Sequence, residues 1–340
     1  MNLYTTDTIR DINEKEWNTL VGTDYLERSH AWYRTVEDSG MRKVRYVFLR
    51  ENKRLTAAAC CYVMDQQIFN MDLSLLGVGC PLGTSSAFFS RTPEQARMLL
   101  KGLEEIQEKE GTRRLTILNL RKEEFTTVKK WVKGFAEFSK LDNTYIDLDF
   151  IDFEDYLSSL DGSARRSVRK TLNRAQKRWG IKPVFTNNLT TWKEVAHRLQ
   201  GYICEQYNDR STHFTKQFYE ALEKNMKENA ELLLLFKDSI PLVFGLSLNS
   251  PEISLHKVVG VDPQYREYQA YFLLYYEGIK RAIERRQKRI YYGLTTYEFK
   301  EKIGCKREEL FGLTRLRNPI LNLALKPYVA VSKLSGKKFR

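Results

Sequence analysis

The chain contains 340 residues, of which 42% are hydrophobic and 29% are charged, and its formal net charge is +13. This composition excludes a disordered chain, and no apolar run reaches the roughly 18 residues that a membrane helix needs. Residues 1–150 carry 22 basic and 22 acidic side chains, whereas residues 151–340 carry 34 and 21. Because a domain averages about 150 residues, the length and this charge step predict two domains, 1–150 and 151–340.

The cysteines and histidines suggest neither a disulfide framework nor a metal site. There are five cysteines, an odd number without CxxC spacing, and four scattered histidines. The chain starts with a polar, acidic segment, which predicts neither a secretory nor a transit peptide. We therefore expect a reduced, cytoplasmic protein without a bound metal.

The first part alternates helical and β-rich segments. Period-two patterns and a proline in a first helical turn, Pro93, define most of them. We expect helices at 14–20, 31–39, 93–110 and 123–138, and strands at 44–50, 55–64, 67–75, 115–120 and 144–150.

The second part repeats a longer version of the same order, without similarity in residue identity. We expect helices at 153–160, 163–179, 191–207, 215–229, 268–286 and 297–303, and strands at 181–186, 231–237, 241–248, 253–261, 288–292 and 310–314. An antiparallel meander followed by a helical crossover predicts an α/β fold with mixed sheets, in which neighbouring strands can diverge. Ligands prefer such discontinuities, so we expect the chemistry at the end of 253–261, the start of 268–286 and the segment after 288–292.

Those places carry a family pattern. It consists of Leu255-His256-Lys257-Val258-Val259-Gly260-Val261-Asp262-Pro263, then Tyr268 to Tyr276, then Tyr292-Gly293, and finally Tyr297-Glu298-Phe299-Lys300 with Gly304. This pattern resembles the second domain of the Fem-like (FemAB-type) branch of the GNAT acyltransferase superfamily, and residues 165–170 resemble its opening basic helix. The resemblance implies two GNAT-like domains in tandem, with the second one catalytic, and the transfer of an acyl or aminoacyl group to an amine.

One loop departs from ordinary GNAT enzymes. Those enzymes seat the pyrophosphate of coenzyme A on a loop whose glycines let backbone N–H groups approach phosphate. The corresponding segment here, residues 266–271, keeps Arg266 and lacks both glycines. We expect no resident cofactor, and both acyl-CoA and aminoacyl-tRNA remain open as the co-substrate. Arg266 and Tyr268 are expected to contact that co-substrate.

The resemblance also suggests catalytic residues. It implies that Lys300 faces the reacting ester, where its positive charge could stabilise the oxyanion or a phosphate; a surface lysine is the alternative. His256, with a pKa near neutrality, could act as the general base, or it could be a half-buried structural histidine. Tyr297 and Tyr292 could supply the proton for the leaving group.

The strand at 253–261 would border the reaction. Strict alternation along it predicts that His256 and Val258 share one face of the sheet. By position, the backbone N–H groups of the segment from Val258 through Gly260 to Val261 could bind the oxyanion.

Two basic clusters point to anionic partners. From Gly162 to Lys193 there are nine basic residues and no acidic one, and Lys280–Arg289 adds six basic residues against Glu284. Such clusters attract phosphates, so Arg165 and Arg169, which share one helix face, are expected to contact tRNA, a carrier protein or a nucleotide-linked substrate. The alternative is a solvated helix face. No motif for sequence-specific DNA binding is present.

These observations favour an N-acyltransferase that moves an acyl group from a thioester to a small-molecule or peptide amine. The first alternative is a Fem-type aminoacyltransferase that uses aminoacyl-tRNA and acts on a peptidoglycan precursor or a small amine. The second alternative is a non-catalytic polyanion-binding module.

Overall fold

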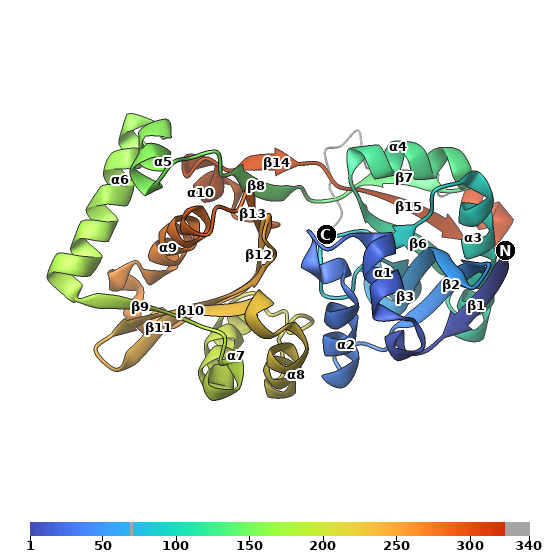
Figure 1. Cartoon of the computed structure of the whole chain (residues 1–340), viewed down its shortest axis with the longest axis horizontal. Coiled ribbons are helices and arrows are strands. Elements are labelled where there is room, and N and C mark those ends of the chain that lie inside the picture. Colours follow the sequence, from blue (N-terminus) through green and yellow to red (C-terminus); the bar gives the residue numbers. More distant parts are fainter. Residues whose placement is uncertain (69–70, 324–340) are drawn as a thin grey trace. The chain divides into compact units, whose positions relative to one another are not determined.

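The computed structural model describes residues 1–68 and 71–323, which form two compact units (Figure 1). The first unit contains Met1–Thr23, Glu27–Asn143 and the described residues from Glu308 onward. The second unit contains Asp24–Leu26 and Thr144–Arg307. Each unit is built on one mixed sheet covered by helices, which confirms the predicted α/β class.

The sheet of the first unit has the strand order β1-β2-β3-β4-β6-β15-β7, with β5 paired to β3. The elements of this unit are β1 (Asn2–Thr6), α1 (Glu14–Val21), α2 (His30–Asp38), β2 (Arg45–Glu51), β3 (Arg54–Ile68), β4 (Met71–Val78), β5 (Phe88–Phe89), α3 (Pro93–Lys109), β6 (Arg114–Leu120), α4 (Lys122–Trp131), β7 (Ala136–Ser139) and β15 (Phe311–Leu316). Helix α3 begins where the sequence predicts, because the Thr92 side chain accepts a hydrogen bond from the Gln95 N–H and Pro93 occupies the first turn.

The sheet of the second unit has the order β14-β8-β13-β12-β11-β10-β9. Its elements are β8 (Asn143–Asp147), α5 (Phe153–Ser159), α6 (Gly162–Asn173), a π-helix (Arg174–Trp179), β9 (Ile181–Thr186), α7 (Leu189–Gln206), α8 (Lys216–Met226), β10 (Ala230–Lys237), β11 (Ile240–Asn249), β12 (Ile253–Val261), a 3-10 helix (Pro263–Tyr268), α9 (Ala270–Glu284), β13 (Arg289–Gly293), α10 (Tyr297–Lys302) and β14 (Lys306–Glu308). Together, α6 and the π-helix match the predicted basic helix at 163–179.

The two sheets follow the same path. In the first unit α3 links β4 to the parallel strand β6, and in the second unit α9 links β12 to the parallel strand β13. In both sheets the strand beyond this parallel pair is antiparallel and comes from a distant part of the sequence, β15 beside β6 and β8 beside β13. The repeat inferred from the order of elements is thus a repeat of topology.

This arrangement corrects the predicted division at residue 150. Strand β8 follows β7 directly in the chain but pairs with β13 in the second sheet, whereas β15, expected in the second domain as 310–314, lies between β6 and β7 of the first sheet. Residues 24–26 also belong to the second unit. The sheet that an apolar strand joins depends on distant partners, so local composition does not reveal it.

Local differences are smaller. The helix expected at 123–138 ends at Trp131, and Ala136–Ser139 pairs with β15 as strand β7. The helix expected from residue 268 begins at Ala270 after the 3-10 turn. Strand β1 was not expected, and it pairs with β2.

Helices cover both faces of the second sheet, with α9 on one face and α7 and α8 on the other (Figure 1). Two glycines mark the close approaches. A Cβ at Gly245 would lie 3.0 Å from the Leu274 side chain of α9, and one at Gly260 would lie 2.5 Å from backbone atoms of Leu199 and Gln200 in α7. Because Gly245 faces α9 and Gly260 faces α7, these two contacts show which face of the sheet each residue of β12 occupies.

Candidate active site

Strands β12 and β13 are paired only at their beginnings. The last registered pair is Leu255 with Tyr291. Within the described chain, β12 pairs from His256 onward with β11 alone, while β13 continues beside β8, where Gly293 pairs with Thr144. The sequence predicted that neighbouring strands diverge toward the end of 253–261, and the structure places the separation at His256. Over residues 257–261, one edge of β12 has no strand partner among the described residues.

A β-bulge at Lys257 changes the faces along β12. Ser247 pairs with His256 and Leu246 pairs with Val258, so Lys257 is the extra residue. Because one extra residue reverses the alternation, His256 faces α9 and Val258 lies on the α7 face. The prediction that the two share a face was wrong.

The imidazole of His256 lies against α9. A Cβ at Gly278 would be 3.0 Å from its Nε2 atom, so glycine at this position provides the necessary room. The ring centroid of Tyr292 lies 4.7 Å from that of His256, and the centroid of Tyr275 lies at 6.3 Å. Burial and the nearby Lys300 ammonium lower the pKa of His256 to about 3. The side chain is therefore a neutral hydrogen-bonding group at pH 7 and a weak base, which corrects the expected pKa near neutrality.

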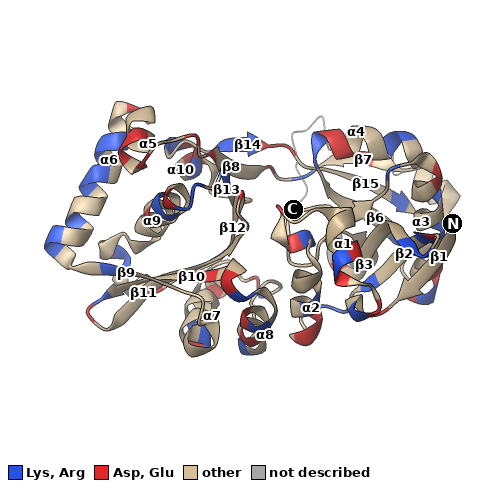
Figure 2. Ribbon diagram, in the orientation of Figure 1, with Lys and Arg blue, Asp and Glu red and all other residues tan. Residues whose placement is uncertain are grey.

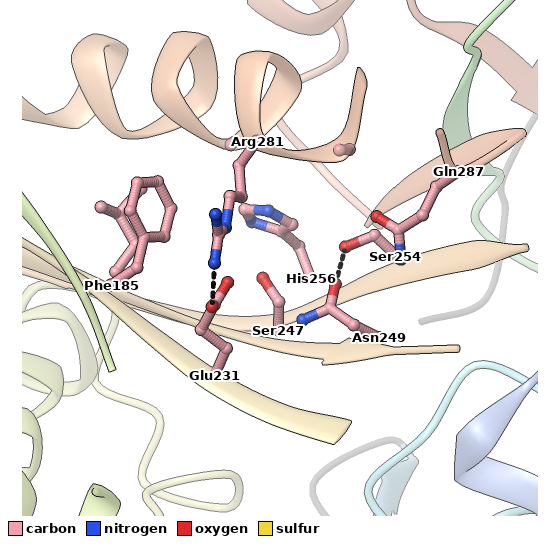
Figure 3. Close-up of a pocket in the computed structure, with 11 residues that line it drawn as sticks. Phe185, Glu231, Ser247, Asn249, Ser254, His256, Arg281 and Gln287 are labelled. Carbon is pink, nitrogen blue, oxygen red and sulfur yellow. Dashed lines mark hydrogen bonds and ion pairs between the residues drawn. The ribbon is translucent and has the colours of Figure 1, made fainter. Parts of the chain in front are cut away.

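Polar side chains form a row across the sheet next to His256. Glu231 on β10 pairs with Ser247 on β11, and Ser247 pairs with His256 on β12. In the adjacent pair, the Ser254 hydroxyl donates to Asn249 Oδ1 at 2.8 Å. Figure 3 shows these side chains in one pocket beneath α9. A sheet face under a helix is ordinarily apolar, so this row provides hydrogen-bonding capacity where packing alone would call for apolar residues.

Basic and amide side chains close the pocket. Arg281 and Arg285 both donate to Glu231 Oε1, at 3.1 and 2.7 Å. Four buried atoms in the pocket lack a hydrogen-bond partner in the described chain: Asn249 Nδ2, His256 Nδ1, Arg281 Nε and Gln287 Oε1. Each such atom costs about 1–3 kcal/mol if unsatisfied, and the space admits about one water molecule. Ordered water fits this pocket in its present form, and a whole substrate does not.

Lys300 is fully engaged within the fold. Its Nζ atom donates to the carbonyl oxygens of Tyr292, Gly293 and Leu294, at 2.8, 3.2 and 3.1 Å. These bonds use all three ammonium hydrogens, and the residue is 1% exposed. Burial lowers the pKa of Lys300 to about 8. In the structure the Lys300 ammonium is directed at the backbone carbonyls at the end of β13.

The two candidate tyrosines lie in different surroundings. Tyr292 is buried against His256, its hydroxyl donates to the Tyr275 carbonyl at 3.3 Å, and burial raises its pKa. Tyr297, at the start of α10, is partly exposed, and the Arg307 guanidinium lies 4.3 Å from its ring centroid. The structure therefore brings His256, Tyr292 and Lys300 together and places Tyr297 beside Arg307.

Val258 and Gly260 lie on β12, in the segment whose backbone was expected to bind the oxyanion. Gly260 is required for packing, because a side chain there would collide with the α7 backbone. Both residues lie on the part of β12 that, among the described residues, pairs with β11 and not with β13.

The predicted co-substrate contacts lie before α9. Arg266 is exposed, and Tyr268 packs its ring edge-to-face on Trp179 at 5.6 Å. Gln269 adopts the left-handed conformation (φ 54°) and does not cap α9 with its side chain. Gln269 thus adopts, without being glycine, a conformation that glycine adopts easily. In the described structure its side chain makes no capping hydrogen bond to the first N–H groups of α9.

Arg165 and Arg169 have partners within the unit. Arg165 donates to the Ser158 carbonyl at 3.4 Å, and Arg169 forms an ion pair with Glu154 at 2.7 Å. Figure 2 shows that basic residues nevertheless continue along α6.

The basic cluster at 280–289 is mostly neutralised. Besides the two arginines on Glu231, Lys288 pairs with Glu252 and Arg289 pairs with Asp147. Four of its six basic side chains are therefore engaged by acids of the same unit, whereas Lys280 and Arg286 have no ion-pair partner among the described residues.

Sequence reasoning missed most of the polar pocket. Glu231 precedes the apolar run Leu232–Phe236, and Gln287 stands within a basic run, so neither suggested a site. The usable signal was the period-two placement of Ser247 and Asn249 on a face where buried strands carry apolar residues.

Two negative findings concern the described residues. Among them, no group of three or more His, Cys, Asp or Glu side chains is placed to hold a metal ion. Their helices include none with the length and apolar character needed to cross a membrane.

Comparison with solved structures shows a shared fold. FemX is 13% identical and matches with a TM-score of 0.65 over 96% of this chain and 100% of its own. The C-terminal domain of a putative lysylphosphatidylglycerol synthetase from Agrobacterium fabrum is 12% identical, with a TM-score of 0.60 over 94% and 95% of the two chains. A tandem GNAT protein from the clavulanic acid biosynthesis pathway is 11% identical, with a TM-score of 0.59 over 94% and 99%.

The fold is therefore that of tandem GNAT proteins, as predicted. A search of curated proteins finds no significant match. The sequence profile of the FemAB-like family, described as peptidoglycan biosynthesis/recognition, matches residues 84–337. The chain belongs to the FemAB-like family.

Proposed function

We propose that this protein transfers an acyl group to an amine at the divergence of β12 and β13. FemAB-like family membership and the tandem GNAT fold support an acyltransferase. The observation that carries the proposal is the strand separation at His256, which leaves the edge of β12 open next to the uncapped start of α9.

These features fit an extended donor. Amide groups of a linear donor can pair with an open strand edge, and phosphate can approach the first N–H groups of α9. The amine attacks the donor carbonyl, the C–N bond forms, and the thiol or hydroxyl leaves with a proton. Backbone N–H groups of β12 are the donors proposed for the oxyanion. His256 and Tyr292 border this space as neutral groups, and Lys300 holds the turn after β13.

The donor is proposed to be an acyl thioester, with aminoacyl-tRNA as the second candidate. Unpaired cations along α6 favour the second candidate. The family description favours a peptidoglycan precursor as the acceptor, and a small amine is the alternative.

A donor panel tests this proposal. The purified protein is mixed with acyl-CoA esters and amines, and free thiol is measured; in parallel, deacylation of aminoacyl-tRNA is followed with the same amines. Amine-dependent thiol release supports the thioester donor, and amine-dependent tRNA consumption supports the second candidate. Failure of both reactions, with polyanion binding retained, would leave a non-catalytic binding module.

A further inference from the structure

Five basic side chains on α6 and the following π-helix are not used by the fold. They are Arg166, Lys170, Arg174, Lys177 and Arg178, and we name them the α6 cation row. Four of them are exposed and Arg174 is partly exposed. Over the described chain, none has an ion-pair partner, in contrast to Arg169 and most of the cluster at 280–289.

The helix geometry aligns these side chains. Val168, Thr171 and Ala175 are buried, which fixes the inward side of the helix. In an α-helix, side chains four residues apart point in directions that differ by only about 40° around the helix axis. Arg166, Lys170 and Arg174 therefore project from neighbouring parts of the helix surface. The π-helix at 174–179 rotates less per residue than an α-helix. Arg178 therefore points back toward the side of the helix that carries Arg166 and Lys170.

The spacing and composition of the row favour a phosphodiester backbone. From Arg166 to Arg178 the helix spans about 18 Å, and one nucleic-acid strand places a phosphate about every 3.4 Å along a duplex. A membrane surface would instead require large apolar side chains beside the cations. Of the described residues of α6 and the π-helix, none is an exposed large hydrophobic one.

We infer that the α6 cation row is a docking surface for the phosphate backbone of a nucleic acid, bound without base-specific contacts. The inference deepens the aminoacyl-tRNA alternative of the proposed function, but it concerns binding alone. According to this inference, the five cations of the row contact the phosphates, and Arg165, Arg169 and the cluster at 280–289 do not.

The test uses the full-length chain and an uncharged tRNA transcript, with no acyl donor present. Binding is followed by fluorescence anisotropy between about 50 and 200 mM salt, the range over which phosphate contacts weaken most. The test variant is Arg166→Gln/Lys170→Gln/Arg174→Gln. The matched control, Lys280→Gln/Arg286→Gln/Lys288→Gln, loses the same charge from the other cluster. A DNA duplex of equal length and vesicles containing anionic phosphatidylglycerol serve as competing ligands.

We expect the test variant to bind tRNA at least about tenfold more weakly and its log–log salt slope to fall by about 2–3, with the control unchanged. Preferential loss of DNA binding would support the same surface with DNA as its ligand. Equal losses in the two variants, or binding to vesicles without binding to tRNA or DNA, would overturn the inference. Because this binding assay contains no acyl donor, its result does not depend on transfer. Binding of tRNA together with failure of both reactions of the donor panel would refute the proposed function and leave this surface intact.

Discussion

Replacing Lys300 by methionine tests whether this lysine is a positioning residue. Methionine has a similar length but cannot donate, so the carbonyls of Tyr292, Gly293 and Leu294 lose their shared donor. Each carbonyl left unsatisfied costs about 1–3 kcal/mol, and removing a desolvated ammonium returns part of this cost. We expect the free energy of unfolding to fall by about 2–5 kcal/mol, a large share of a typical total of about 5–15 kcal/mol.

Urea unfolding measures this change, and amide hydrogen exchange over residues 289–296 locates it. The matched control is Lys302→Met on the same helix, where an exposed ion pair with Glu298 is lost. Both side chains of that pair are exposed, so its loss should change stability little. If Lys300→Met is as stable as the control, the positioning role is refuted. Full stability combined with lost transfer would assign Lys300 directly to catalysis.

Three further changes probe the same unit and its neighbour. Because the folded pKa of His256 lies near 3, below the ordinary 6.5, the unfolded chain binds the extra proton between these values. Unfolding free energy should then fall on acidification through this window by up to about 1.4 kcal/mol per pH unit, and His256→Gln should reduce that slope by the same amount in a urea titration series. Gly278→Ala should destabilise by about 1–3 kcal/mol through contact with the imidazole; a double-mutant cycle with His256→Ala should show coupling, and additivity would disprove the contact. Deleting residues 308–340 removes β15 from between β6 and β7 and should abolish cooperative unfolding of the first unit, measured by calorimetry. A chain ending at Leu323 keeps β15 and should keep cooperative unfolding; cooperative unfolding of the chain without β15 would show that this strand is dispensable.

The candidate site was only partly predictable. That two neighbouring strands diverge near the end of 253–261 followed from the order of elements, because a meander with a helical crossover constrains which strands are neighbours; the position of the divergence, His256, came from the structure. The single-residue bulge at Lys257 did not follow, and it reversed the face of every later residue on β12. The partners of Lys300 were equally hidden, since they are backbone carbonyls that carry no sequence signal.

The availability of the basic side chains was also only partly predictable. Counting basic residues identified two clusters, but whether a cation is available depends on acids brought near it by folding. Glu231 lies about 50 residues before Arg281 in the chain, and Asp147 is more distant still from Arg289. Among the described residues, the five members of the α6 cation row have no ion-pair partner, whereas four of the six cations at 280–289 do.

The sequence by itself determined the class of fold, most helices and strands, and the family resemblance, because periodicity, caps and short motifs are local properties of the chain. The tertiary structure alone decided which sheet β8 and β15 join, which face His256 occupies, and which cations remain free. These depend on pairings between residues far apart in the sequence, whose free energy is gained only when the whole sheet forms.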